Sequence, residues 1–335
     1  MRTETGAVDV AWVGAVSFEE RCVGSLVALA ADVQRIDRAI LLDYSTRAAP
    51  AAVDQARRSE NADAMTRAVL RLSGRAPDRR QIAPYASESL RLLLEEIANE
   101  IRPTTVFFDI SCLTKVHAIS LASALVSEFH HLRWRVAYTM PENYGDLAAF
   151  GASSSWRDII IGPVAESAVL FNEAQGRGII VPGHEGDRLA VALAELEPSG
   201  GLVLFADAKG RPDLRRLSEQ KNQRILRHLI GLRSRSWTQA RVGVADWHTA
   251  ARLVTKEIEL ARRSDAPIIL FPFGPKSLLF VVAAQLAAEY PEASWFVYPV
   301  PSIYDANYSE GIGRTVWLAG EELSGVVAGV ERVPS

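Results

Sequence analysis

The sequence has few cysteines and no regular set of metal ligands. Its 335 residues include two cysteines, Cys22 and Cys112, which are too few for a disulfide framework. We expect small buried thiols, although both lie in loops where a shared site is conceivable. His117 and His184 are the nearby histidines and show no paired ligand spacing, so we expect no metal site.

Strong charge and long apolar runs are also lacking. A net charge of −3 gives no sign of the basic surface that non-specific nucleic-acid binding requires. The longest apolar runs, such as residues 278–288, are shorter than the roughly 20 residues of a membrane span, so we expect no membrane partner. The opening MRTETGAVDV lacks the basic start and apolar core of a signal peptide, and a cytoplasmic protein is therefore the expectation.

Two common nucleotide-binding signatures are missing. Neither the Gly-rich dinucleotide fingerprint nor the Walker phosphate loop occurs in the sequence, which disfavours an ordinary NAD or ATP enzyme. No serine or cysteine stands at a G-x-S-x-G nucleophile elbow. We expect no cofactor.

What is present is an alternation of apolar strands and helical patterns. Apolar strands that alternate with helices predict mainly parallel sheets covered by helices on both faces. In the first half, strands are expected at residues 8–14, 39–45, 81–84, 105–111 and 134–140, with helical patterns at 21–33, 61–72, 87–101 and 117–130.

The same order restarts at Arg177 and predicts an internal repeat. Three pairs of residues keep their spacing in both halves: Asn61 and Asn222, Lys115 and Lys276, and Trp134 and Trp295. Several spacings in register on the same expected elements favour two tandem Rossmann-like α/β units. We expect the first at 1–150, a crossover at 151–176 and the second at 177–335.

The stretch TVFFDISCLTK, residues 105–115, is the main candidate site. It predicts a strand, a short polar loop and a helix start, and ligands of parallel sheets lie at that edge. Lys115 at a helix start opposes the helix dipole unless an anion joins it, so Asp109, Ser111, Thr114 and Lys115 are candidate phosphate-binding residues. Alternatively, Ser111 and Thr114 only cap the helix and Lys115 points into water.

A related loop, FPFGPKS, follows the matching strand of the second half. Gly274 and Lys276 are its candidate ligand-binding residues. Counting from the two lysines places Leu270 opposite Asp109, so the second loop has lost the acid. The two sites are therefore expected to be related but unequal, with one ligand across both or with one live site and one scaffold site.

An acidic triplet precedes the first helix. Glu19 and Glu20 could be a catalytic acid pair oriented by Arg21, or one glutamate could cap the helix while Arg21 forms an ion pair. Arg188 stands at the matching place in the second half. Both arginines are candidates for holding phosphate oxygens through their planar guanidinium groups.

The DISCLTK loop resembles the last loop of CRISPR-associated Rossmann-fold (CARF) sensor domains. That loop runs acid or Asn, apolar, Thr or Ser, two small residues, Thr and Lys, and the order is matched by Asp109, Ile110, Ser111, Thr114 and Lys115. Cys112 and Leu113 depart from it, because the family usually has glycine there. The second loop matches only through Gly274 and Lys276. The resemblance implies a sensor of a signalling oligonucleotide in prokaryotic defence, with a tandem repeat supplying both halves of the usual dimer site.

These observations favour binding over catalysis. We expect a nucleotide, oligonucleotide or other phosphorylated small molecule in a cleft between the repeats, in a defence or stress-signalling system. About 20 residues, 315–335, follow the last repeated element of the second unit, so any effector is expected to be a separate protein, unless the second repeat has acquired an activity. The alternatives are a hydrolase, phosphodiesterase or glycosyl-transfer enzyme acting on nucleotides, with Glu19 or Glu20 as the base, and a non-catalytic subunit of a defence complex.

Overall fold

A computed structural model describes most of the chain, in nine segments. These are residues 9–32, 35–44, 52–144, 156–168, 176–184, 186–209, 211–232, 236–301 and 309–323. The chain forms two compact units. The N-terminal unit comprises Met1–Leu121, Phe129–Gly145 and Asp305–Gly320, and the C-terminal unit comprises Ala122–Glu128, Asp146–Tyr304 and Glu321–Ser335. Among the described residues, no helix is both long and apolar enough to cross a membrane.

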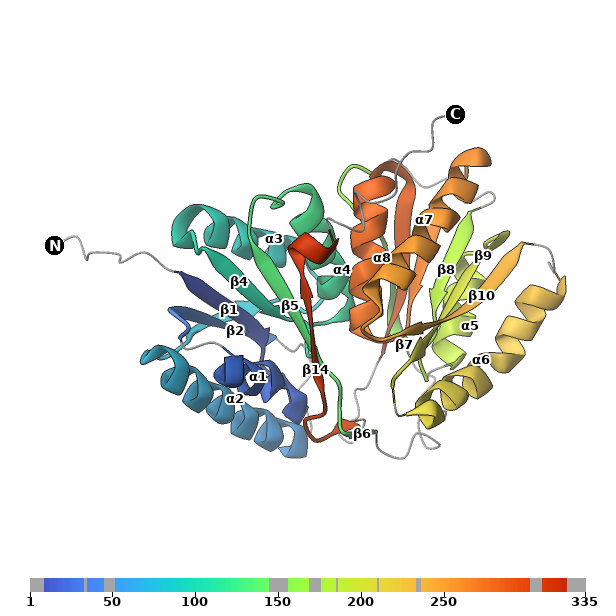
Figure 1. Cartoon of the computed structure of the whole chain (residues 1–335). Helices are drawn as coiled ribbons and strands as arrows, with labels where there is room; N and C mark the ends of the chain where they lie inside the picture. Colours follow the sequence, from blue (N-terminus) through green and yellow to red (C-terminus); the bar gives the residue numbers. More distant parts are fainter. Residues whose placement is uncertain are drawn as a thin grey trace. The chain divides into compact units, whose positions relative to one another are not determined.

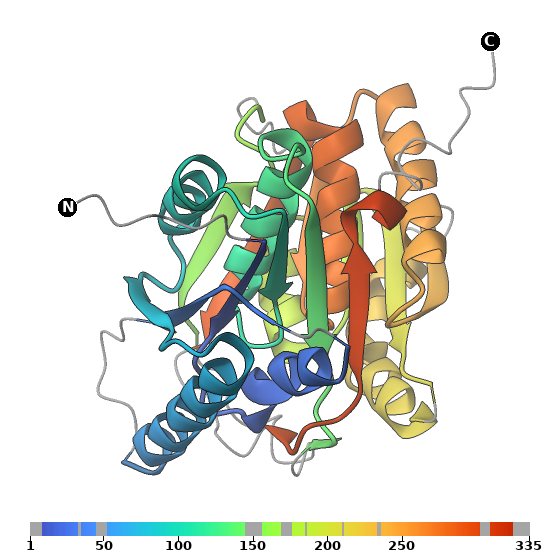
Figure 2. The same ribbon diagram turned by 60° about the vertical axis from the view of Figure 1, so that its left-hand side comes forward.

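The N-terminal unit is built on a six-stranded sheet (Figure 1). Five strands are parallel, and the sixth, at one edge, is antiparallel. Helices α1 and α2 cover one face, and α3 and α4 lie on the other (Figures 1 and 2). In sheet order the strands are β14 (Thr315–Ala319), β5 (Trp134–Thr139), β4 (Thr105–Asp109), β1 (Val10–Ala15), β2 (Arg38–Tyr44) and β3 (Asp78–Ile82). The helices are η1 (Glu20–Val23), α1 (Gly24–Asp32), α2 (Ala52–Ser73), α3 (Ser87–Glu96), the π-helical turn η2 (Ile97–Ile101) and α4 (Lys115–Ser127).

The C-terminal unit has a sheet with the same order of elements. Its five parallel strands again end at an antiparallel edge strand. In sheet order the strands are β10 (Trp237–Gly243), β9 (Gly200–Asp207), β8 (Arg177–Val181), β11 (Ile268–Pro272), β12 (Ser294–Pro301) and β7 (Trp156–Pro163). The helices are α5 (Gly186–Glu195), α6 (Pro212–Leu232), α7 (Trp247–Arg263), α8 (Lys276–Glu289) and η4 (Pro291–Ala293).

The antiparallel edge strands are exchanged along the chain. Strand β7 follows β5 in sequence but pairs with β12, and β14 follows β12 but pairs with β5. Between them, β6 (Asn143–Tyr144) and β13 (Ser309–Glu310) pair with each other. Each sheet is therefore completed by a strand that follows, in the sequence, the last parallel strand of the other sheet.

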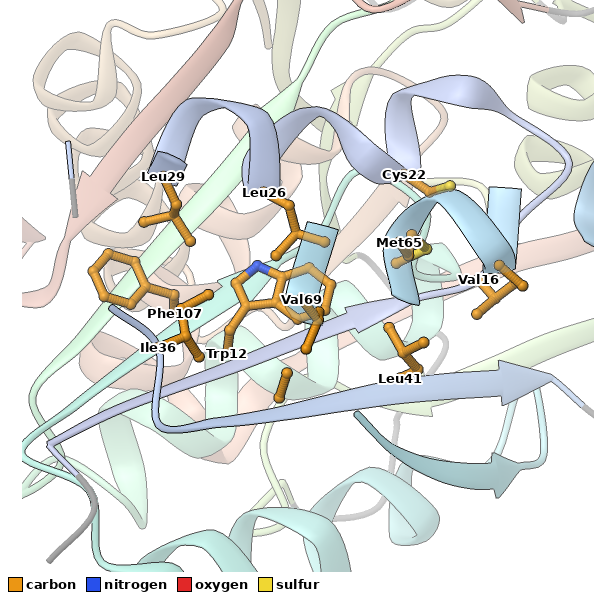
Figure 3. Close-up of a cluster of buried hydrophobic side chains, with 12 residues drawn as sticks. Trp12, Val16, Cys22, Leu26, Leu29, Ile36, Leu41, Met65, Val69 and Phe107 are labelled. Atoms are coloured by element: carbon orange, nitrogen blue, oxygen red, sulfur yellow. The ribbon is translucent and has the colours of Figure 1, made fainter. Parts of the chain in front are cut away.

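The core of the N-terminal unit forms where α1 and α2 meet the sheet (Figure 3). Trp12 and Leu41 of the sheet and Leu26 and Met65 of the helices are fully buried there. Trp317 of β14 packs against the same cluster, with its ring edge-on to Phe107 at 5.5 Å between centroids. The exchanged strand thus belongs to the hydrophobic core of this unit.

In the C-terminal unit, side chains of α5 and α6 pack against apolar strands. Ile180, Val203 and Phe271 are fully buried on the sheet, opposite Leu189. Helix α7 shows why such helices start where they do: the Asp246 carboxylate caps it by accepting a hydrogen bond from the Thr249 N–H at 3.1 Å. Burial of the apolar face of each helix holds α5 and α6 against the sheet.

The expected fold class is confirmed, since both units are α/β with largely parallel sheets flanked by helices. The strands and helices expected before residue 141 and after residue 177 are present, with shifted ends such as α2, which begins at Ala52. The expectation missed β7 within the crossover and β14 near the end of the second expected unit. The domain boundaries 1–150, 151–176 and 177–335 stay predictions.

Candidate functional site

The candidate loop of the N-terminal unit begins at the end of a central strand. Asp109 is the last residue of β4 and is paired in register with Gly14 of β1. Because the strands are parallel, the loops that follow both strands leave the sheet at the same edge. This edge carries the residues that the sequence singled out in this unit.

Asp109 is a buried anchor of the loop, with 2% of its surface exposed. One carboxylate oxygen accepts the Ser111 N–H at 2.8 Å, and the other accepts the Ser25 hydroxyl of α1. The Ser25 oxygen in turn accepts the Trp12 indole N–H at 3.2 Å. Burial raises the pKa of Asp109, while the hydrogen bonds from Ser111 and Ser25 and the charge of Arg21 oppose that rise. Asp109 therefore joins β4 to α1 and β1.

Ser111 is also buried and is committed to the protein. Its Oγ accepts the Thr139 N–H at 2.8 Å, and the Thr139 hydroxyl lies 2.9 Å from the Thr315 hydroxyl of β14. With none of its surface exposed, the Ser111 side chain fixes the loop to β5. In this geometry Asp109 and Ser111 position the loop, and contact with a ligand would need their present hydrogen bonds to break.

Thr114 and Lys115 are half-buried at the start of α4. The Thr114 oxygen accepts the His117 N–H at 3.1 Å and so caps the helix. Lys115 is the first residue of the helix, where unpaired backbone N–H groups favour an anion. Of the candidate residues in this loop, these two are the ones within reach of solvent.

Behind this helix start lies a buried histidine. His117 Nε2 is 3.0 Å from the Ala86 carbonyl oxygen, which can only accept, so Nε2 carries the proton. The Tyr44 hydroxyl, 2.9 Å from Nδ1, then donates to that nitrogen and accepts the Thr114 N–H at 3.2 Å. Burial lowers the pKa of His117 to about 4. The neutral imidazole therefore supports the loop and is a poor acid or base near neutral pH.

The low pKa of His117 predicts a loss of stability in mild acid. Between about pH 6.5 and 4 the unfolded chain takes up a proton at this position, whereas the folded protein does not. Stability is full above pH 6.5 and falls by about 2 kcal/mol at pH 5, reaching its limit below pH 4. Urea unfolding at several pH values should show this slope, and His117→Gln should flatten it. Replacing the exposed His130 by Gln should leave the slope unchanged.

The two glutamates before α1 differ in access. Glu19 Oε2 accepts from Arg21 Nε at 2.8 Å and from the Ser309 hydroxyl, so its carboxylate is held by the protein. Glu20 is exposed and accepts the Gly311 N–H at 2.9 Å. Glu20 is therefore the one of the pair that could meet a substrate.

Arg21 is buried beside its acidic neighbour. Its guanidinium forms an ion pair with Glu19 at 2.7 Å and lies 5.9 Å from the centre of the Tyr138 ring. Although burial alone lowers the pKa of Arg21, the charge of Glu19 and other neighbours raises it well above its usual value. An arginine with 6% of its surface exposed would have to leave this pair before it could hold a phosphate.

A cavity of about 400 Å³ lies in the N-terminal unit, beside Glu20. It is lined by side chains from the loop after β1, from α2 and from the β6 and β13 segments, with more carboxylates than cations. Asp109 and Lys115 are not among them. The lining residues are Phe18, Glu20, Arg57, Glu60, Asn61, Glu142, Asn143, Ser309, Glu310 and Gly311.

The second candidate loop is shorter and tightly packed. Three residues separate β11 from α8, whereas five separate β4 from α4. Strand ends therefore place Pro272, not Leu270, opposite Asp109, and Leu270 is buried inside β11. A Cβ on Gly274 would lie 2.5 Å from Cγ1 of Val181, so glycine is needed for close approach to β8.

The remaining candidates of the C-terminal unit are a lysine and an arginine. Lys276 is half-buried and is the first residue of α8, as Lys115 is of α4. Arg188 is buried, with Nε donating to the Pro299 carbonyl at 3.1 Å and its guanidinium 4.8 Å from the centre of the Tyr298 ring. Arg188 thus resembles Arg21 in lying against a tyrosine of the last parallel strand. The expected cleft shared by the two units stays a prediction.

Two asparagines have a role that spacing alone did not reveal. The Asn61 side-chain amide donates to the Ser17 carbonyl at 3.0 Å, in the loop after β1. The Asn222 amide donates to the Gly183 carbonyl at 2.8 Å, in the loop after β8. In each unit an asparagine of α2 or α6 therefore fixes the loop that follows β1 or β8. The sequence marked both asparagines only by their equal spacing from Lys115 and Lys276, which did not show what they bind.

Comparisons with known proteins give a fold. No protein-family model and no curated protein matches the sequence. The chain resembles a solved type III CRISPR defence DNA nuclease activated by cyclic oligoadenylate, with a TM-score of 0.53 and 9% identity, covering 86% of this chain and 65% of that one. A multidomain NRPS module with adenylation, ketoreductase and pseudo-Asub parts matches at a TM-score of 0.21 and 8% identity, too low to carry an argument. The chain therefore shares its fold with the nuclease and spans less than two thirds of it.

Proposed function

We propose that the protein binds a nucleotide or another phosphorylated small molecule at the start of α4. The observation that carries this proposal is the half-buried Lys115, at the first position of a helix whose N–H groups face the carboxyl edge of a parallel sheet. Thr114 is the neighbouring residue, while the buried side chains of Asp109 and Ser111 fix the loop through hydrogen bonds. Lys276 occupies the corresponding position on α8, and Gly274 gives its loop room.

The same proposal includes a duplicated unit of CARF type. The two sheets have the same order of strands, and both end at an antiparallel edge strand. Asn61 and Asn222, and likewise Arg21 and Arg188, make comparable contacts in the two units. These pairs support a tandem repeat in which both units descend from one ancestor.

A signalling nucleotide is the ligand class we favour. The nuclease with the shared fold is activated by cyclic oligoadenylate, which supports a sensor role in prokaryotic defence or stress signalling for this chain. Its effector would then be a separate protein. Arg21 and Arg188 remain second choices as phosphate contacts, because both are engaged in the free protein.

The test is the substitution Lys115→Ala, with cyclic oligoadenylate as the probe. Loss of a charge-assisted hydrogen bond to phosphate should weaken binding by about 10- to 100-fold, measured by calorimetry. The thermal midpoint of the free protein should stay within a few degrees, since the Lys115 side chain is only partly buried and lies at the first position of α4. Lys256→Ala, which removes an exposed lysine of α7, is the matched control and should bind normally. Equal affinity in Lys115→Ala, or its unfolding, would refute the assignment.

A second candidate function is nucleotide turnover at the cavity beside Glu20. The exposed Glu20 carboxylate lines this space and could act as a general base. Purified protein would then hydrolyse a nucleotide, and Glu20→Gln would stop turnover while binding persists. Turnover that survives in Glu20→Gln would exclude this role for Glu20.

A further inference from the structure

The two cysteines of the chain lie in neighbouring loops of the N-terminal unit, although they are 90 positions apart in the sequence. Cys22 lies on η1 after β1, and Cys112 lies in the loop after β4. Those two strands are neighbours in the sheet, so both loops start from adjacent points. Cys22 faces the core beside Met65 (Figure 3), and Cys112 packs against the same core cluster.

The pair is unequal in access. Cys22 has 1% of its surface exposed, whereas Cys112 is half-buried, and both are thiols. The neighbouring Cys112 thiol and burial raise the pKa of the Cys22 thiol, and Cys22 Sγ lies 4.0 Å from the Ser17 carbonyl oxygen. An accessible cysteine beside a second thiol is the arrangement in which a sulfenic acid can condense with a resolving thiol to form a disulfide.

Cys112 is also close in sequence to the candidate ligand contacts. It precedes Thr114 by two residues and Lys115 by three. Cys22 follows the Ser17–Arg21 segment, whose backbone is held by Asn61. A covalent bond between the two sulfurs would therefore join the loop of Lys115 to the loop after β1.

We propose that Cys22 and Cys112 form a reversible disulfide that locks the Ile110–Thr114 loop to the loop after β1 under oxidation. With hydrogen peroxide as the oxidant, the Cys112 thiolate attacks one oxygen and the O–O bond breaks, giving a sulfenic acid and hydroxide, which takes up the proton that the Cys112 thiol lost and leaves as water. The Cys22 sulfur then attacks the Cys112 sulfur, the S–O bond breaks, and the Cys22 proton leaves with hydroxide as a second water. Two thiols lose two electrons, and the peroxide gains them.

The crosslink is tested on the whole reduced chain by intact mass and alkylation. After peroxide treatment the wild-type protein should lose about 2 Da and both alkylatable thiols, and dithiothreitol should restore them. In Cys22→Ser, Cys112 should instead gain oxygen, and in Cys112→Ser the buried Cys22 should stay reduced. A wild-type protein that keeps two alkylatable thiols, or gains oxygen at Cys112 without a crosslink, would overturn the proposal.

The locking is tested by hydrogen exchange without any ligand. Amides of peptides 16–23 and 110–117 should exchange more slowly in the oxidised wild-type protein than in the reduced one, and oxidised Cys22→Ser should show no slowing. A crosslink that leaves both peptides unchanged would contradict the locking. That the lock alters ligand contact rests on the function proposed above. Failure of the probe to bind reduced protein would refute that function and leave the mass result standing.

Discussion

Leu318→Asp is expected to unfold the N-terminal unit, although this residue lies near the far end of the chain. Leu318 has 1% of its surface exposed and is paired with Val136 of β5. A buried aspartate without a partner costs several kcal/mol, here about 4 or more, against total stabilities of roughly 5–15 kcal/mol for ordinary domains. Displacement of β14 would also break the contact between the Trp317 ring of this strand and the Phe107 ring of the core.

The measurement is limited proteolysis combined with mass spectrometry of the fragments. Cleavage in Leu318→Asp should begin within residues 9–144, far from the substitution in sequence. The matched control is Ile161→Asp on β7, the corresponding edge strand of the C-terminal unit, where the side chain is 44% exposed. That control should remain resistant. First cleavage in the C-terminal unit of Leu318→Asp would contradict the strand pairing.

Asp109→Ala should destabilise the protein by about 3 kcal/mol, because it leaves the Ser111 N–H and the Ser25 hydroxyl without their acceptor in a buried place. The carboxyl volume is lost as well, which adds a small cavity. Denaturant unfolding of the free protein measures this cost. Asp109→Asn, which keeps the shape and one acceptor oxygen, should lose clearly less.

This result separates positioning from ligand contact. If Asp109→Ala unfolds at a lower denaturant concentration while Lys115→Ala keeps its unfolding midpoint, Asp109 stabilises the fold and Lys115 contacts the ligand. An Asp109→Ala protein of unchanged stability that has lost the probe would instead make Asp109 a direct contact.

Much of the fold was open to prediction from the sequence. Apolar runs such as those around Phe107 and Ile269 mark parallel strands buried on both faces, and Asp246 marks the start of a capped helix. The edge strands β7 and β14 were missed for a physical reason. Strand β14 has only five residues, and β7, although eight residues long, has side chains at residues 158–161 that are all at least partly exposed, so neither has the pattern of a strand buried on both faces. The partner of each strand is fixed only by tertiary structure.

The candidate site could be predicted only in part. The sequence located the polar loop before α4 and named Thr114 and Lys115. It could not show that the side chains of Asp109 and Ser111 are already hydrogen-bonded within the protein, because their partners Ser25 and Thr139 lie 84 and 28 residues away in the sequence. Spacing from the lysines also assigned Leu270 to the place of Asp109, since a loop shorter by two residues leaves no mark in an apolar run.

The exchanged strands set an order of events during synthesis. When β5 leaves the ribosome, its edge partner β14 still lies 176 residues downstream. At translation rates of about 5–20 residues per second, that edge waits roughly 9–35 seconds. Strand β7 is likewise made before β12, its partner. Neither sheet is complete until β12 and β14 have emerged, so we expect the nascent chain to present an open edge at β5 and an unpaired β7 to chaperones, and to finish folding late.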